Sequence, residues 1–342
     1  MDFHQLKVFV EVARQKSFSR AAETIFLTQP TVSAHIKALE NEVGTLLLDR
    51  SQRELQLTDA GKVLLRYARQ LLAIKEEAIF ATQEERRVID GHLEIASSSV
   101  PGAYILPELM SSFLEKHPAV TFAVMLRDTR QVYENVREYS YDLGFVGEPA
   151  LLDGLEQIQL LQDELVLIAA PGTRLSGERA VPEEAAEGWQ SESPAQGKNE
   201  GGVAGSSSKF PSPLFEFDLN AGDNAAELLQ LPFVMREPGS ATRLVFENAL
   251  EEYYGQNKTI LQVIAYLESQ EAIKEAVKTG LGVTVISRHA VKDELAAGLL
   301  KGYRLAGLEL ERSFYLIYHQ NRILSPLSRA FLEHCADCFS GS

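Results

Sequence analysis

Apolar residues recur at intervals of three and four through the first part of the chain, a spacing that predicts helices. The first helix would bury a stripe made of Phe3, Leu6, Phe9 and Ala13. Ser17 is placed to cap a second helix, in which the small residues Ala21 and Ala22 permit close helix packing. Thr28 can cap a third helix, because Pro30 is tolerated in a first turn whose amides have no intrahelical partner.

The predicted third helix has one apolar and one polar face. Its inward positions are Val32, Ile36, Leu39 and Val43, with Gly44 at its end. Its outward positions are Gln29, Thr31, Ser33, Ala34, His35 and Lys37. Gln, Ser and Thr side chains can hydrogen-bond base edges, and Lys and His can reach phosphate or guanine, so this face suits DNA. A three-helix bundle with a solvated polar face has the same periodicity, and spacing alone does not separate the two interpretations.

Residues 48–58 are predicted to form a short two-stranded wing after the three helices. Arg50 and Arg53 in this segment are placed to contact the DNA backbone in an adjacent groove. Together these elements predict a winged helix-turn-helix over residues 1–58. The candidate DNA-binding residues are Ser19, Arg20, Gln29, Pro30, Thr31, Ser33, His35, Lys37, Arg50 and Arg53.

Residues 1–89 resemble the winged helix-turn-helix and linker helix of LysR-type transcriptional regulators. The resemblance is carried by residues 18–22, 28–33, 36, 39–40, 44, 47, 50 and 57–61. The family often has a basic residue where this chain has Ala34. Base reading is therefore expected from His35, from Lys37, or from the N-terminal pair Gln29 and Thr31.

Residues 58–89 are predicted to form one long helix. Leu65, Leu72 and Ile79 are seven apart, a repeat typical of a helix-packing seam. A core helix of a monomeric domain is the alternative, but charged residues on the other faces favour a partly exposed dimer helix. These are Arg66, Arg69, Lys75, Glu76 and Glu77. The resemblance implies that residues 59–89 pair two subunits, and that a homodimer or homotetramer reads an inverted repeat in promoter DNA.

From Gly91 onward, predicted strands alternate with predicted helices, which implies an α/β domain with a largely parallel sheet. The resemblance sharpens this to an effector-binding domain over residues 91–342, with two lobes like those of periplasmic binding proteins. The first lobe is expected to contain residues 91–164 and 268–342, and the second residues 165–267.

Three segments at the predicted carboxyl ends of strands are candidates for a small-molecule site, because helix N-termini there offer free amides. The candidate effector-binding residues are Ser98, Ser99, Val100, Arg130, Gly147, Glu148, Gly239, Ser240, Thr242 and Arg243. Their hydroxyls, amides and fixed positive charge suit a carboxylate or another oxyanion. The alternatives are polar turns, an ordinary capped helix start and surface arginines; the place of 98–100 in the family's effector loop favours ligand contact.

Residues 173–225 are unusual, because the stretch 188–208 is rich in Gly, Ser, Glu and Pro and has few apolar anchors. Such a composition cannot easily offset the entropy of ordering, and the family usually has a shorter connection here. We therefore predict a flexible insertion in the second lobe. Weak docking of Phe210, Leu214, Phe215 and Phe217 is the alternative.

The charge is unevenly distributed along the 342 residues, whose formal net charge is −15. Residues 1–89 hold 13 of the 33 Lys and Arg residues and 12 of the 48 Asp and Glu residues, so the acidity belongs to the rest of the chain. That part should be repelled from DNA. No apolar run reaches membrane-spanning length, and the N-terminus lacks the apolar segment of a signal peptide, so we expect a cytoplasmic protein without a membrane partner.

The motifs of the common enzyme classes are missing: no Gly-x-Ser-x-Gly, no P-loop and no His-Glu-x-x-His occurs. We expect no catalytic residue, no cofactor and no metal site. Cys335 and Cys338 form a Cys-x-x-Cys pair without a second ligand pair, so free thiols are expected and a redox or metal switch is the alternative.

Together these patterns predict a LysR-type DNA-binding regulator whose acidic C-terminal domain senses a small anion or carboxylate and changes the dimer geometry at a promoter. RNA polymerase is an expected further partner. The segments 98–101 and 239–243 look most similar to regulators of sulfur or selenium metabolism. The alternatives are an effector-independent regulator, a solute-binding protein, which the helix-turn-helix disfavours, and an enzyme with a DNA-binding appendage.

Overall fold

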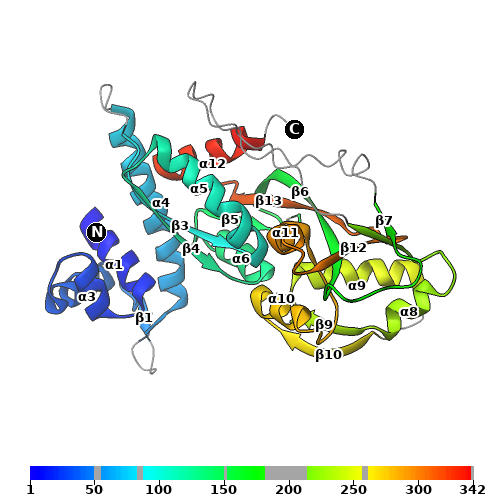
Figure 1. Cartoon of the computed structure of the whole chain (residues 1–342). Helices are drawn as coiled ribbons and strands as arrows, with labels where there is room; N and C mark the ends of the chain where they lie inside the picture. Colours follow the sequence, from blue (N-terminus) through cyan, green and yellow to red (C-terminus); the bar gives the residue numbers. More distant parts are fainter. Residues whose placement is uncertain (50–54, 83–87, 150–151, 182–213, 256–260, 340–342) are drawn as a thin grey trace, which may run out of the picture.

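The computed structural model describes residues 1–49, 55–82, 88–149, 152–181, 214–255 and 261–339. A helical N-terminal module lies at one end of the molecule and an elongated α/β domain at the other, with helix α4 (Asp59–Thr82) between them (Figure 1). Among the described residues, no helix is both long and apolar enough to cross a membrane.

The N-terminal module has the predicted three helices and wing. They are α1 (Phe3–Gln15), α2 (Phe18–Thr24), α3 (Gln29–Val43) and the antiparallel strands β1 (Leu48–Asp49) and β2 (Gln56–Leu57). The predicted caps are confirmed: the side chains of Ser17 and Thr28 accept backbone hydrogen bonds at the starts of α2 and α3. Gly44 ends α3 in the left-handed region, with a φ of 77°.

One predicted inward position of α3 is wrong. Val32, Ile36 and Leu39 are fully buried, but Val43 is 41% exposed. It lies in the last turn of the helix, so continuing the periodic pattern to the end of the helix predicts one core residue too many.

Helix α4 uses two different apolar faces. Leu65 and Ala68 are buried in the core of the N-terminal module, and Gly61 lies so close to Leu47 that a Cβ atom there would be 2.0 Å from its carbonyl oxygen. The residues of the predicted seven-residue seam therefore do not form one common surface, because Leu65 is buried within its own chain while Ile79 is exposed. The exposed apolar face instead carries Val63, Tyr67 and Ile74, spaced four and seven apart.

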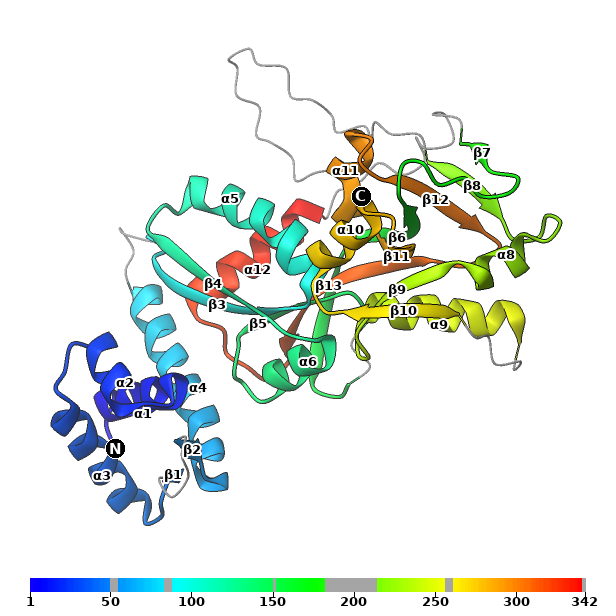
Figure 2. The same cartoon turned by 60° about the horizontal axis from the view of Figure 1, so that its bottom comes forward.

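The first lobe is a sheet with helices on both faces. Its elements are β3 (Gly91–Ser97), η1 (Pro101–Ile105), α5 (Leu106–Lys116), β4 (Val120–Leu126), α6 (Thr129–Arg137), β5 (Leu143–Val146), the first half of β6 (Leu155–Ala169), β13 (Glu311–His319) and α12 (Pro326–Phe339). The strand order is β4-β3-β5-β13-β6. Helices α5 and α12 cover one face and α6 the other (Figure 2).

The second lobe is built on the far half of β6. Its elements are β7 (Arg179–Ala180), β8 (Phe215–Asp218), α8 (Asn224–Gln230), β9 (Pro232–Arg236), α9 (Ala241–Tyr254), β10 (Gln262–Leu267), α10 (Gln270–Lys278), β11 (Thr284–Ser287), η2 (Arg288–Val291), α11 (Lys292–Ala296) and β12 (Lys301–Ala306). Strands β11 and β12 pair with β6, β12 continues through β8 to β7, and β9 pairs with β10. Strand β6 therefore carries the chain from the first lobe into the second, and β13, which pairs with it, carries the chain back from β12 to the first lobe.

The predicted boundary at residue 268 is wrong. Strands β11 and β12 pair antiparallel with residues 165–169 of β6 and share the core of the second lobe, so the chain returns to the first lobe only at β13. The sheet is also mixed rather than largely parallel, because β6 and β13 run antiparallel to their neighbours.

The segment 173–225 differs from the prediction at both of its ends. Phe217 in β8 is fully buried in the second-lobe core, Leu214 is buried as well, and β8 pairs with β7 and β12. These side chains anchor their strand in the lobe, so the flanks are not a flexible loop. Residues 182–213, including Phe210, lie outside the described residues, and their flexibility stays a prediction.

Candidate nucleic-acid interface and effector cleft

Helix α3 lies on the side of the N-terminal module that faces away from the α/β domain (Figures 1 and 2). Of the candidate DNA-binding residues, Ser19, Arg20, Gln29, Pro30 and Lys37 are exposed, and Thr31, Ser33 and His35 are half-buried. Arg50 and Arg53 lie outside the described residues. The structure thus gathers the α2 and α3 candidates around one protruding helix of the kind that enters a major groove.

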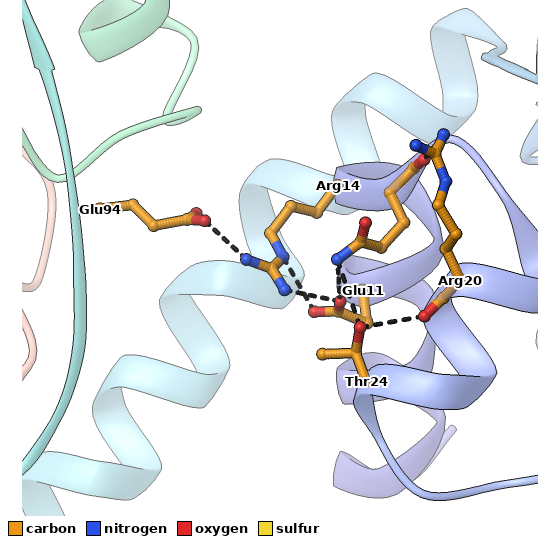
Figure 3. A network of polar contacts seen from close by, with 6 residues as sticks. Glu11, Arg14, Arg20, Thr24 and Glu94 are labelled. Atoms are coloured by element: carbon orange, nitrogen blue, oxygen red, sulfur yellow. Dashed lines mark hydrogen bonds and ion pairs between the residues drawn. The ribbon is translucent and has the colours of Figure 1, made fainter. Parts of the chain in front are cut away.

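Several candidate side chains are already held by neighbours within the module. The hydroxyls of Thr28 and Thr31 hydrogen-bond at 2.8 Å, and the His35 ring packs edge-on against His4 with centroids 4.9 Å apart. Arg20 donates from its guanidinium to the carbonyl of Gln15 at 2.8 Å. Its own carbonyl accepts from Thr24 at 2.9 Å, in a network that continues through Glu11 to Arg14 (Figure 3).

The turn after α3 depends on a buried carboxylate that the candidate set lacks. Glu40 is buried, and its Oε1 accepts hydrogen bonds from the amides of Leu47 at 3.0 Å and Leu48 at 3.4 Å. These bonds fix the direction in which the chain leaves α3 and enters the wing.

We expect Glu40→Ala to destabilise the N-terminal module by about 2 kcal/mol, because two buried amides lose their acceptor. Chemical denaturation followed by circular dichroism measures the change. Glu40→Gln keeps an acceptor oxygen and should cost clearly less. An equal loss in both variants would mean that the charge, not the acceptor, stabilises the turn.

A cavity of about 720 Å³ lies between the two lobes. Its walls come from the carboxyl ends of β3, β4, β5 and β9, from the starts of α6, α9 and α10, and from β13. Seven of the candidate effector-binding residues line it: Ser98, Ser99, Val100, Gly147, Gly239, Ser240 and Thr242. The structure therefore brings together three segments that are far apart in the sequence.

Three candidates do not line the cavity. The Arg130 side chain is 89% exposed and pairs with Glu134 at 3.3 Å, because the second residue of α6 points outward. Arg243 pairs with Glu247 at 2.7 Å along α9. The carbonyl of Glu148 accepts from the Tyr133 hydroxyl at 2.7 Å, and burial raises the pKa of the Glu148 carboxyl.

Three arginines that the candidate set lacks line the cavity: Arg127, Arg236 and Arg312. Arg127 follows β4, is exposed, and donates to the carbonyl of Leu126 at 2.7 Å. Arg236 ends β9 and is the first residue of the segment 236–243, from which the candidate set contains only Gly239, Ser240, Thr242 and Arg243. Arg312 lies at the start of β13, where no motif marks it. The missed polar residues Thr129 and Gln270 begin α6 and α10 at the same cavity.

Arg312 connects the cavity to the crossing strands. Its Nε donates to the fully buried carboxylate of Asp163 on β6 at 2.9 Å, and its Nη1 donates to the Thr242 hydroxyl at 3.0 Å. The Ser287 hydroxyl also donates to Asp163, at 2.8 Å. Arg312 is more than nine-tenths buried, yet its Nη2 has no hydrogen-bond partner among the described residues. A buried guanidinium N–H in this state favours an acceptor from a bound molecule.

Arg236 links the two lobes at the other side of the cavity. Its guanidinium binds Glu237 through two bonds of 2.7 Å, and its Nη1 donates to the Ser99 hydroxyl of the first lobe at 3.3 Å. Burial tends to raise the pKa of Glu237, but the bonds from Arg236 outweigh it and the pKa is lowered. Gln270 donates to the same Ser99 hydroxyl at 3.4 Å, and its Oε1 is buried without a partner in the described structure.

Helix starts add backbone amides to the cavity wall. The side chains of Asp128 and Ser269 cap α6 and α10, but Ser240 makes no side-chain cap bond to α9. The α9 start therefore keeps amides and a positive dipole end available. Guanidinium, hydroxyl and amide donors together suit an oxyanion.

The two cysteines lie in helix α12 and do not line the cavity. Cys335 is buried in the first-lobe core, and burial raises the pKa of its thiol. Burial also raises the pKa of Cys338, whose Sγ lies 3.7 Å from Nε2 of His334. A raised pKa reduces the thiolate fraction and hence reactivity. Among the described residues, no group of three or more His, Cys, Asp and Glu side chains is arranged to hold a metal ion.

The chain matches two family descriptions over most of its length. Residues 3–62 match "Bacterial regulatory helix-turn-helix protein, lysR family", and residues 86–190 and 215–340 match "LysR substrate binding domain". A "Probable RuBisCO transcriptional regulator" of Cyanophora paradoxa is 30% identical over 339 residues, which cover 98% of this chain and 91% of the relative.

Solved structures share the fold. A full-length OxyR variant from Pseudomonas aeruginosa is 19% identical with a TM-score of 0.68, over 99% of this chain and 94% of that one. The regulatory domain of Synechocystis PCC6803 CcmR, solved in complex with 2-PG, is 24% identical with a TM-score of 0.55, over 73% of this chain and 98% of that one. The chain belongs to the LysR family of transcriptional regulators: it is not an enzyme but a DNA-binding regulator with an effector-binding domain.

Proposed function

We propose that a small oxyanion binds in the cavity between the lobes and changes how two recognition helices are held on promoter DNA. The observation that carries the proposal is that Arg312 lines the cavity while its buried Nη2 has no hydrogen-bond partner in the described structure. The hydroxyls of Ser99 and Thr242 and the open start of α9 supply further donors around the cavity.

The lobes are held together across this cavity by contacts that a ligand would change. Ser99 accepts from Arg236 and Gln270 of the second lobe, and Tyr104 donates to Glu271 at 2.9 Å. An effector shifts the angle between the lobes only to the extent that it binds one angle more tightly than the other. An anion that bridges donors from both lobes has such a preference.

A physical connection runs from the cavity to the N-terminal module. Helix α6 starts at the cavity with Asp128 and Thr129, and the turn at its other end places the carbonyl of Tyr139 against the guanidinium of Arg69 in α4. Arg14 of α1 also binds Glu94 of β3 at 2.7 Å (Figure 3). Movement of the first lobe is therefore expected to move the DNA-binding module.

Two exposed apolar surfaces support a homo-oligomer. One is the α4 face with Val63, Tyr67 and Ile74, and the other is on the outer strand β10, with Ile264 and Tyr266. A dimer needs one self-complementary surface, and a closed tetramer needs a second, so the chain carries surfaces for both.

We expect Val63→Glu to dissociate the dimer, because it buries an unpaired charge in the α4 contact. Tyr266→Glu should leave a dimer and remove only the tetramer. Sedimentation velocity measures both. Lys62→Glu, at the adjacent exposed position, is the matched control and should keep the wild-type assembly. Dissociation by this control as well would point to charge repulsion rather than to the apolar face.

The promoter region beside the protein's own gene provides the DNA for the test. Binding that persists over competitor DNA and weakens steeply with salt supports a specific regulator that acts at an inverted repeat. RNA polymerase as a partner and a cytoplasmic location remain predictions that follow from that role. Repeating the gel shift with small anions tests the effector; no change with any anion would favour the effector-independent alternative.

The proposed effector class is small oxyanions in general, and it is not limited to the anions of sulfur or selenium metabolism. The relative named above is a RuBisCO regulator, which gives no support to the sulfur or selenium subgroup. The anion panel should therefore contain sulfate and selenate together with carboxylates, phosphate and 2-PG.

A further inference from the structure

The Arg236 guanidinium is already occupied by a carboxylate of its own chain. Nε and Nη2 of Arg236 bind the two carboxylate oxygens of Glu237, each at 2.7 Å. This is the two-pronged geometry in which arginine binds a ligand carboxylate or phosphate. Both residues line the cavity, so the neighbouring residue fills the place where an effector anion would bind.

Of the two partners, Glu237 is the one that can leave. The Arg236 side chain is 10% exposed, ends strand β9 and is held by Ser99, whereas the Glu237 side chain is 28% exposed. Glu237 also begins the turn that contains Gly239, whose φ is +94°. A rotation of the Glu237 side chain into the open cavity frees the guanidinium without moving the strand.

We propose that Glu237 occupies the anion position of the effector-free protein and that an effector oxyanion binds by displacing it from Arg236. This rests on the proposed function, since it assigns the regulation of the same cavity. The internal carboxylate keeps the guanidinium paired when no ligand is bound, which avoids an uncompensated buried charge.

Displacement sets a condition on the effector. Glu237 is tethered beside Arg236, so its effective concentration is in roughly the millimolar range or above, and a carboxylate that only repeats its two bonds competes poorly. A successful oxyanion must add contacts that Glu237 does not make. The Nη2 of Arg312 offers a donor and the Oε1 of Gln270 offers an acceptor, since both are unpartnered within the described residues. An oxyanion that also carries a hydroxyl, or a protonated phosphate, satisfies both.

The test measures binding of inorganic phosphate and of acetate to the full-length protein by isothermal titration calorimetry. We expect Glu237→Gln to bind phosphate about tenfold more tightly than the wild type, because a neutral amide competes less well for the guanidinium. Glu237→Asp keeps the charge but is one methylene shorter, and it should also bind phosphate more tightly. A larger gain for phosphate than for acetate identifies a phosphate effector, and the reverse identifies a carboxylate.

Glu247→Gln is the matched control. It removes the same charge from the same lobe and also unpairs an arginine, Arg243. Neither residue lines the cavity, and the other bond of Arg243 goes to the Arg236 backbone carbonyl at 3.1 Å rather than to its guanidinium. Phosphate affinity in this variant should stay at the wild-type value. Equal affinity in the wild type and both Glu237 variants overturns the displacement and leaves the anion site standing. If no form of the protein binds either anion while promoter DNA is still bound, the anion effector itself is overturned.

Discussion

Replacing Arg312 with Met is expected to destabilise the effector-binding domain by about 3–5 kcal/mol, the cost of leaving a buried charge without its partner. Asp163 has no exposed side-chain surface and would keep the hydrogen bond from Ser287 but lose its compensating charge. The pair joins β6 to β13, the two strands that cross between the lobes. Its loss therefore weakens the place where the lobes are connected.

The midpoint of urea unfolding, followed by far-ultraviolet circular dichroism, measures the change. Arg304→Met is the matched control, because Arg304 is 44% exposed and its partner Glu164, on the same strand as Asp163, keeps its ion pair with Arg288 at 3.3 Å. No buried carboxylate is left without a cation, so this loss should be much smaller. The double variant Arg312→Met with Asp163→Asn should recover most of the loss. Failure to recover would show that packing around Arg312, rather than the unpaired charge, stabilises the crossing.

The parts of the fold that sequence reasoning predicts well are the local ones. The caps at Ser17, Thr28 and Gly44 depend on hydrogen bonds and backbone angles within a few residues, so residue type and spacing are sufficient. Val43 continues the same periodic pattern but is exposed, because the length of the buried stripe depends on which neighbouring helix covers it. Periodicity carries no information about where that cover ends.

The boundary between the lobes depends on contacts that no local pattern contains. Phe217 lies beside a stretch of low-complexity composition, yet it is fully buried because β8 pairs with β12, where its register partner is Leu305. Strand β12 and the return of the chain at β13 are likewise set by pairing with β6. Composition describes what a segment would do alone, and long-range pairing can override it.

A similar reason explains why some candidate effector residues line the cavity and others do not. Ser98, Ser99, Ser240 and Thr242 lie in turns between a strand and a helix or at the helix start, and the carboxyl ends of neighbouring strands meet at one edge, so the sequence places them together. The direction in which a long side chain points, in contrast, does not follow from its position in the sequence. Arg130 and Arg243 point along their helices to Glu134 and Glu247, whereas Arg236 and Arg312 reach the cavity from within strands.

Replacing Arg69 with Met is expected to separate effector binding from DNA binding. Burial and the neighbouring Arg322 lower the pKa of Arg69 to about 10, so the side chain stays charged at neutral pH and needs the acceptor that Tyr139 provides. The turn that follows α6 is itself fixed, because Arg322 donates to the carbonyl of Tyr141 at 3.2 Å and pairs with Asp142. Helix α6 thus joins the cavity to α4 over about 13 Å, the length of nine helical residues.

The measurement is the operator affinity of the full-length protein with and without the anion that binds it most tightly. Coupling between two sites typically changes affinity by about 5–150-fold, and Arg69→Met should reduce the change to less than about twofold. Its effector-free DNA affinity should stay close to that of the wild type, because Arg69 lies in α4 and faces the first lobe rather than α3.

Lys75→Met is the matched control, because it removes a charge from the same helix at a position where the Lys75 ammonium lies over the Phe3 ring, 5.0 Å from its centroid. Coupling in this variant should stay at the wild-type value. Undiminished coupling in Arg69→Met would mean that the signal reaches the recognition helices by another contact, of which the ion pair between Arg14 and Glu94 is the next to test.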